Sequence, residues 1–239
     1  MLLAVALTAV SSWAIARQPP DSRPRPATIQ VTGEAMVSET PDRVYIDIGV
    51  TTQAQKSEAA AAQNAARLSA VIAAVRRVAG SAAQLTTAEY SISPSYNYPH
   101  DGGTPTVVGY TASNVVQVRL DDLSRVGKVI DSAAQAGSNN VQDIRFALRD
   151  EQVARTEALR QAARKASQDA AALAGALGLS VVRVLSVDEQ SPLLMPGRVY
   201  PQSVQMARVE AAPPTPVEPG TVAVNATVTL TVEVAPAKR

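Results

Sequence analysis

The chain has 239 residues, 46% of them apolar and only 3% aromatic, and it contains no cysteine. The length allows one large domain or two small ones. The lack of cysteine excludes disulfides, thiolate metal sites, cysteine nucleophiles and a lipidated cysteine at a mature N-terminus. The 22 Lys and Arg residues nearly balance 21 Asp and Glu residues. Because this balance creates no strong field, we expect no nucleic-acid partner.

The N-terminal segment has the features of an export signal. An apolar run from Leu2 to Ile15 ends in the cleavage-site pattern Ala14-Ile15-Ala16. The run is too short to cross a bilayer, which takes about 20 residues. We therefore predict a signal peptide at 1–16 that is cleaved after Ala16. A Pro-rich tether follows at 17–27, and the periplasmic mature form is expected to have no membrane span.

The next part of the chain alternates strand and helix patterns. Apolar and polar residues alternate at 28–37 and again at 44–50, which predicts two half-buried strands. From Ser57 to Ala79 the apolar residues recur at helical spacing, and Gly80 stands where a helix is expected to end.

A strand is predicted at 85–93, ended by Pro94, and a turn-rich loop follows at 96–103. Further elements are a strand at 107–120, a short helix with Asp122 as its N-cap, and a strand at 141–149. The segment 43–149 thus has the order β-α-β-β-α-β. This order predicts an α+β fold of the ferredoxin-like plait type, which hosts many unrelated functions.

The remaining segment supplies a long helix at 151–177, a short strand at 181–187, a Pro-rich loop at 191–220 and a final strand at 222–234. We expect it to form a second subdomain, from 28–42 and 150–235, within one domain spanning 28–235. The helix carries an a/d-like stripe that would let a partner helix approach closely. Its members are Leu159, Ala163, Ala166, Ala170, Leu173 and Leu177.

The final strand shows the clearest alternation in the chain, and at about 3.3 Å per residue it would reach roughly 40 Å. A strand of this length overshoots a small plait. We therefore expect it to pair with the N-terminal strand or with another subunit, and to leave a β-rich edge that assembly into a homo-oligomer would cover.

Groups suited to catalysis are few. His100 is the only histidine, it stands in a Pro/Gly loop beside Asp101, and the chain has no G-x-S-x-G elbow. The pairs Asp121-Asp122 and Asp150-Glu151 stand at helix starts, where acidic residues cap the free amides. We therefore predict no catalytic, cofactor-binding or metal-binding residues, and no enzyme activity.

Four tyrosines lie on or near two neighbouring strands around one loop: Tyr90, Tyr96, Tyr98 and Tyr110. Cross-strand packing is the commoner explanation of such a group. A sugar-binding or aromatic surface is the alternative.

Several segments, in this order and spacing, resemble the SIMPL-domain family of bacterial envelope proteins. They include IQVTGE at 29–34, SISPSY at 91–96, GYTASN at 109–114, IRF at 144–146, MAR at 206–208 and VEPG at 217–220. The similarity covers about 29–234. It implies an envelope protein and supplies no agreed catalytic residues.

Two functions of different kinds follow from these observations. The first is an exported structural or interaction protein that self-assembles. The alternative is a periplasmic module that binds a small ligand or a glycan through the tyrosines. The protein or glycan partner is not identified by the sequence.

Overall fold

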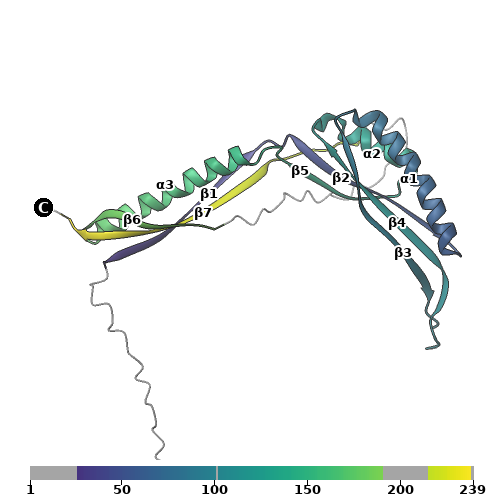
Figure 1. Cartoon of the computed structure of the whole chain (residues 1–239), viewed down its shortest axis with the longest axis horizontal. Helices are drawn as coiled ribbons and strands as arrows, with labels where there is room; N and C mark the ends of the chain where they lie inside the picture. Colours follow the sequence, from purple (N-terminus) through teal and green to yellow (C-terminus); the bar gives the residue numbers. More distant parts are fainter. Residues whose placement is uncertain (1–25, 101, 191–214, 238–239) are drawn as a thin grey trace, which may run out of the picture.

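The computed structural model describes residues 26–100, 102–190 and 215–237. These residues form two antiparallel sheets at the two ends of an elongated molecule; two helices lie on one face of the first sheet and one helix on one face of the second (Figure 1). The predicted α+β class is therefore confirmed. The predicted signal peptide, nearly all of the tether, and the loop up to residue 214 lie outside the described residues.

The first sheet has four strands in the order β3-β4-β2-β5, and two helices cover one of its faces. Along the chain its elements follow the predicted β-α-β-β-α-β order. They are β2 (Arg43–Ala54), α1 (Ser57–Ala79), β3 (Gln84–Asn97), β4 (Thr106–Leu120), the 3-10 turn η1 (Leu123–Arg125), α2 (Val126–Gln135) and β5 (Asn140–Ala147).

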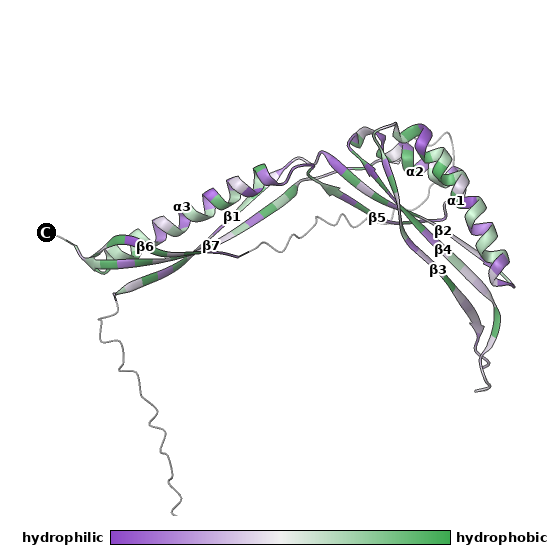
Figure 2. Ribbon diagram, viewed as in Figure 1, coloured by the Kyte–Doolittle hydropathy of each residue, from purple (hydrophilic) through white to green (hydrophobic). Residues whose placement is uncertain are grey.

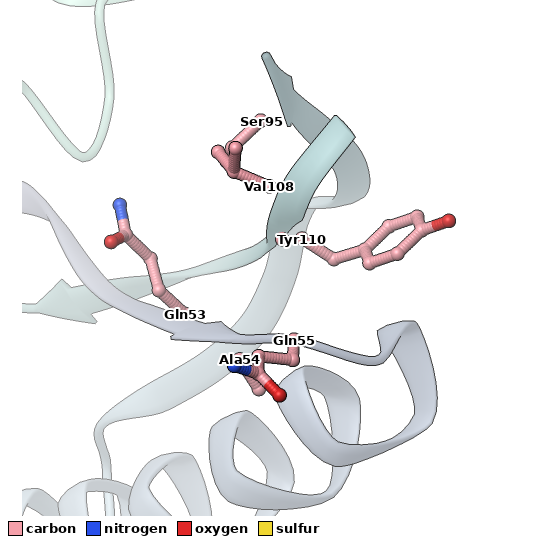
Figure 3. A pocket seen from close by; sticks show the side chains of 7 residues that line it. Gln53, Ala54, Gln55, Ser95, Val108 and Tyr110 are labelled. Carbon is pink, nitrogen blue, oxygen red and sulfur yellow. The ribbon is translucent and has the colours of Figure 1, made fainter. Parts of the chain in front are cut away.

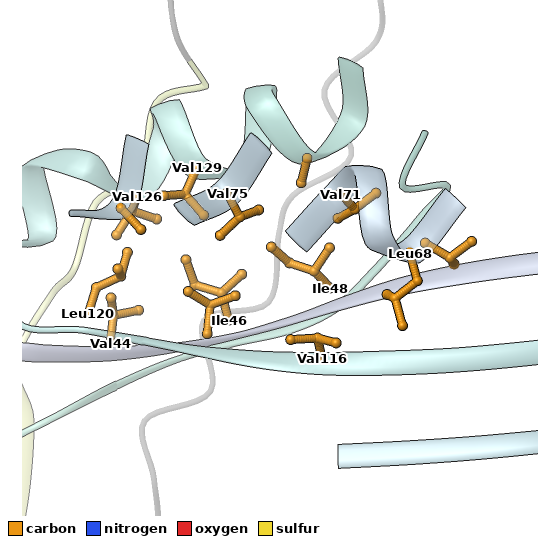
Figure 4. Close-up of a cluster of buried hydrophobic side chains, with 14 of the residues drawn as sticks. Val44, Ile46, Ile48, Leu68, Val71, Val75, Val116, Leu120, Val126 and Val129 are labelled. Atoms are coloured by element: carbon orange, nitrogen blue, oxygen red, sulfur yellow. The ribbon is translucent and has the colours of Figure 1, made fainter. Parts of the chain in front are cut away.

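The core of this sheet is built from small aliphatic side chains between β2, β4 and the two helices (Figure 4). Every second residue of β2 from Val44 to Val50, including Ile46 and Ile48, points to the helical face and is fully buried. Val75 of α1 and Val129 of α2 meet them from the helix side. Each such side chain contributes about 1.5–3 kcal/mol by its burial, so these residues hold the helices on the sheet.

The strand β3 continues past Pro94 to Asn97, so the expectation that Pro94 ends it is wrong. The physical reason is its position at the sheet edge, where β4 is its partner strand. An edge strand tolerates proline because an N–H that faces away from the sheet needs no partner. The hairpin of β3 and β4 is therefore longer than the sequence predicts.

The second sheet has three strands in the order β1-β7-β6: β1 (Thr28–Glu39), β7 (Val222–Pro236) and β6 (Leu179–Gln190). β1 pairs antiparallel with β7 from Thr28 opposite Glu233 to Glu39 opposite Val222. The expected pairing of the final strand with the N-terminal strand is thus confirmed. Apolar and polar residues alternate along β7 (Figure 2).

The expectation that β7 has an exposed edge is wrong, because β7 is the middle strand of its sheet. β6 spans Leu179–Gln190 and is longer than predicted, so it pairs along β7 on the side opposite β1. Leu230 and the other apolar residues of β7 are buried beneath a helix of the same chain. Among the described residues, β1 and β6 are the outer strands of this sheet.

The long helix α3 (Gln152–Ala176) covers the second sheet, mainly over β1 and β7. The predicted stripe is wrong in part: Ala166 and Ala170 are buried, but Leu173 and Leu177 are exposed. Residues four apart along a helix form a row inclined by about 26° to the helix axis. The strands of a twisted sheet can lie along such an inclined row. The buried row consists of Ala154, Ala158, Ala162, Ala166, Ala170 and Ala174.

Gly33 in β1 lets this helix approach the sheet. A Cβ atom added at Gly33 would overlap the carbonyl oxygen of Ala162 and lie 2.6 Å from the backbone nitrogen of Ala166. Neither atom can move without shifting the helix backbone. The contact therefore requires glycine on the strand and alanine on the helix.

The two sheets are joined where the chain crosses between them. The side chain of Asp42, between β1 and β2, accepts a 2.6 Å hydrogen bond from the backbone N–H of Arg149, between β5 and α3. On the way to β7, the Thr215 hydroxyl donates to Asp131 of α2 at 2.6 Å. No helix in the described segments is both long and apolar enough to cross a membrane.

We predict opposite effects for two glycine-to-alanine variants in the second sheet and its helix. Gly33→Ala should lower the free energy of unfolding by about 1–3 kcal/mol, because overpacking forces backbone shifts. Gly175→Ala in α3 should raise it by about 0.5–1 kcal/mol, because an added Cβ there meets no atom within 4 Å and alanine favours the helix. Urea unfolding of both variants tests this. Equal stability of Gly33→Ala and the parent protein would contradict the close contact.

Candidate functional site

His100 is exposed in the turn that follows β3. Its sequence neighbour Asp101 lies outside the described residues.

The predicted capping role is confirmed for one residue of each acidic pair. Asp122 accepts hydrogen bonds from the backbone N–H of Ser124 at 3.1 Å and from Arg125 at 2.8 Å. Asp150 accepts from the backbone N–H of Gln152 at 2.9 Å, where α3 begins. Each carboxylate satisfies an amide that the first helical turn leaves free.

Asp121 has a different role from the predicted one. Arg43 binds both of its carboxylate oxygens, at 2.7 and 3.1 Å, and Arg149 lies 3.9 Å away. These residues, the Arg43–Asp121–Arg149 cluster, come from the start of β2, the end of β4 and the β5–α3 connection. The cluster therefore lies where the two sheets join, and its geometry indicates a structural role.

The cluster changes the acidity of its carboxylate. The hydrogen bond from Arg43 lowers the pKa of Asp121, burial opposes this effect, and the charges of Arg43 and Arg149 lower it further. The same hydrogen bond raises the pKa of Arg43. Both groups are therefore held in their charged forms at neutral pH.

A metal site does not assemble in the part of the chain that the structure describes: no three His, Cys, Asp or Glu residues lie together there.

The β3–β4 hairpin carries an exposed aromatic group. Tyr90, Tyr96 and Tyr98 are all about half exposed or more, and the rings of Tyr96 and Tyr98 lie 6.3 Å apart at 52°. Across the ladder Tyr96 stands opposite Val107. The one ring contact therefore lies between residues two apart along the chain, and cross-strand packing between tyrosines is not seen, because Tyr90 stands opposite Asn114 and Tyr110 opposite Pro94.

Next to the hairpin lies an open hollow of about 260 Å³, lined by Gln53, Ala54, Gln55, Ser95, Val108, Gly109 and Tyr110. Figure 3 shows the side chains of Gln53 and Tyr110 extending in opposite directions. A ligand site needs polar groups that converge on one point. Gln53 and Tyr110 therefore do not converge on one point in the hollow.

The surface that sequence reasoning missed is the edge strand β6. Five of its apolar residues are exposed by 38 to 62%, whereas the valines and the leucine of β7 beside it are buried. These exposed residues are Val181, Val182, Val184, Leu185 and Val187. Isolated exposed apolar residues are ordinary on a protein surface, but a contiguous group marks a contact surface.

One row of β6 points to the same face as α3. Antiparallel neighbours share a face, and Val181, Val184 and Val187 stand opposite Val234, Val232 and Leu230 of β7, which lie under the helix. We call these three residues the β6 valine row. Register shifts after Val181 and Val184 leave Val182 and Leu185 as the extra residues of two irregularities, which are common at sheet edges.

The helix α3 contacts β6 near both ends of the strand. Arg155 of α3 pairs with Glu189 at 2.6 Å, and Leu179 is partly buried against the alanine core. Between these contacts the helices of the described chain leave the valine row exposed. The pattern that could have revealed it is the run VVRVLSV at 181–187, which is apolar on both faces and is too rich in valine for a simple half-buried strand.

A comparison with models of protein families identifies the family of this chain. Residues 29–232 match the family model named SIMPL, described as a protein of unknown function (DUF541). The chain belongs to the SIMPL family. The match runs from β1 into β7, so the SIMPL region includes both sheets and the exposed strand β6.

Individual relatives agree with this assignment. The 26 kDa periplasmic immunogenic protein of Brucella melitensis is 32% identical over 177 residues, which cover 72% of this chain and 71% of the relative. The Brucella abortus protein of the same name matches equally well. The uncharacterized protein YggE of Edwardsiella ictaluri is 26% identical over 159 residues, or 66% of each chain.

We predict that Arg43→Gln raises the pKa of Asp121, because it removes the hydrogen bond that lowers it. A depressed carboxylate pKa stabilises the fold above the ordinary aspartate value of about 3.9, and this contribution is lost as the pH falls through the folded-state pKa. The variant should therefore lose less stability on acidification than the parent protein.

An NMR titration of the Asp121 carboxyl group measures the shift directly. Arg125→Gln is the matched control, since Arg125 acts on Asp122 and should leave the pKa of Asp121 in place. An unchanged Asp121 pKa in Arg43→Gln would show that the ion pair does not exist in solution.

Proposed function

We propose that this SIMPL protein is an exported, non-enzymatic component of the bacterial envelope that acts by assembling with copies of itself. The observation that carries the proposal is the uncovered strand β6, with five exposed apolar residues at a free sheet edge. Such an edge offers unpaired backbone groups to another chain, and proteins usually cover or blunt it.

The non-enzymatic part of the proposal is supported by the roles of the acidic residues. Asp122 and Asp150 satisfy helix amides, and Asp121 is bound by Arg43. Three of the four carboxylates in the two acidic pairs therefore have structural partners. His100 stands apart from them in the hairpin turn.

The export part of the proposal is supported by the N-terminal sequence and by relatives. The apolar run and the Ala14-Ile15-Ala16 pattern fit a signal peptide cleaved after Ala16. The two Brucella relatives are named periplasmic proteins. We therefore place the mature chain in the periplasm.

The glycan-binding alternative has weaker support. The exposed rings of Tyr96 and Tyr98 favour it, but the side chains of Gln53 and Tyr110 at the neighbouring hollow point apart. Self-assembly accounts for the exposed apolar residues of β6, whereas a glycan-binding module leaves them unexplained.

The assembly proposal predicts that protein beginning at Arg17 is larger than a monomer at micromolar concentration. Light scattering coupled to size-exclusion chromatography measures the mass. Leu230→Lys is expected to unfold the chain rather than dissociate it, because Leu230 lies in the intrachain core and an unpaired buried lysine is costly. A monodisperse monomer across the micromolar range contradicts self-assembly.

A further inference from the structure

We propose that β6 of one copy pairs antiparallel with β6 of a second copy, in a register that places Arg183 opposite Asp188 and Val184 opposite Val187. This inference rests on the proposed self-assembly and names its interface. The two three-stranded sheets then become one sheet in the order β1-β7-β6-β6-β7-β1, with α3 of both copies on the same face.

The first argument is the free edge itself. β7 occupies one side of β6, and no strand of the described chain occupies the other. Outward-facing N–H and C=O groups of an edge strand bind another strand without any change in fold. β1, the other edge, has its apolar face already covered by α3, with Val31 buried and Ile29 partly so. Pairing of two β6 strands instead places their two exposed β6 valine rows side by side.

The second argument is charge complementarity along β6. Arg183 and Asp188 lie on the face opposite α3, because they stand across from Glu233 and Thr229 of β7. Arg183 already pairs with Glu233 at 2.6 Å, whereas Asp188 accepts only a 3.4 Å hydrogen bond from Ser186 and joins no ion pair among the described residues. Antiparallel pairing of two β6 strands gives each Asp188 an arginine of the other copy.

The third argument is that the same register matches the apolar residues. When Arg183 is opposite Asp188, the next pair along the strand is Val184 opposite Val187, and symmetry repeats both pairs. A shift of the register by one residue in either direction places Arg183 or Asp188 opposite a valine. Residues that project from opposite faces of the sheet would then stand across from each other. Opposite charges and β-branched pairs directly across an antiparallel ladder are each favourable.

The chain contains no cysteine, so introduced thiols can report this register without interference. We expect Val184→Cys mixed with Val187→Cys to form a disulfide-linked dimer under mild oxidation. Directly opposed residues have Cα atoms about 4.5–5.5 Å apart, within the range that a disulfide spans. Each variant alone should stay uncrosslinked, because identical positions lie several residues apart across the two-fold axis.

Both sites are more than half exposed in the single chain, so the variants should keep the melting temperature of the parent protein when reduced. Gln30→Cys on the edge strand β1 is the control, and mixed with either β6 variant it should not crosslink. Crosslinking of Gln30→Cys with a β6 variant would show head-to-tail pairing of β6 with β1.

The outcomes separate this inference from the proposed function. An assembled protein whose Val184→Cys and Val187→Cys mixture fails to crosslink, or crosslinks no more than either variant alone, overturns the register while self-assembly stands. A protein that light scattering shows to be monomeric overturns both.

Discussion

The organisation of this protein depends on the width of a single helix. An α-helix with its side chains is about 10 Å across, whereas neighbouring strands lie about 4.8 Å apart. One helix therefore covers two strands well and a third one poorly. The four-stranded sheet has two helices, but the three-stranded sheet has α3 alone, and α3 lies mainly over β1 and β7.

The close contact of α3 with β1 strengthens this constraint. Gly33 and the alanine row let the helix backbone approach the sheet, and small side chains do not extend far to either side of the contact line. Leu173 and Leu177, which are long enough to reach outward, are exposed rather than folded over β6. The composition of the helix thus leaves the β6 valine row exposed, and we propose that β6 of a second copy pairs beside it.

The four-stranded sheet is covered by two helices, which bury a core that includes Val44 and Phe146. Asp122 satisfies a helix amide, and Asp121 belongs to the Arg43–Asp121–Arg149 cluster. The cluster and the Asp42–Arg149 hydrogen bond fix the place where the sheets meet. An assembly through β6 would therefore carry the four-stranded sheet, with its tyrosine-bearing hairpin, away from the contact.

The sequence predicts where the strands and helices of this fold lie along the chain better than it predicts which of them pack or pair with each other. Strict alternation in β7 and helical spacing from Ser57 to Ala79 report burial on one face, and both elements were located correctly. Alternation does not reveal which strands lie on either side, so β7 was expected at an edge although it lies in the middle. The alanine row was misplaced because alanine stands on several faces of α3, and only the contact with Gly33 selects one.

Hydrogen–deuterium exchange at two protein concentrations tests most directly whether β6 is the contact edge. If β6 strands pair, the outward amides of 179–190 should exchange more slowly at the concentration where the mass is that of an assembly, while those of β1 and β3 remain unchanged. Equal exchange of 179–190 in monomer and assembly would contradict the account, because the strand would then be unpaired in both.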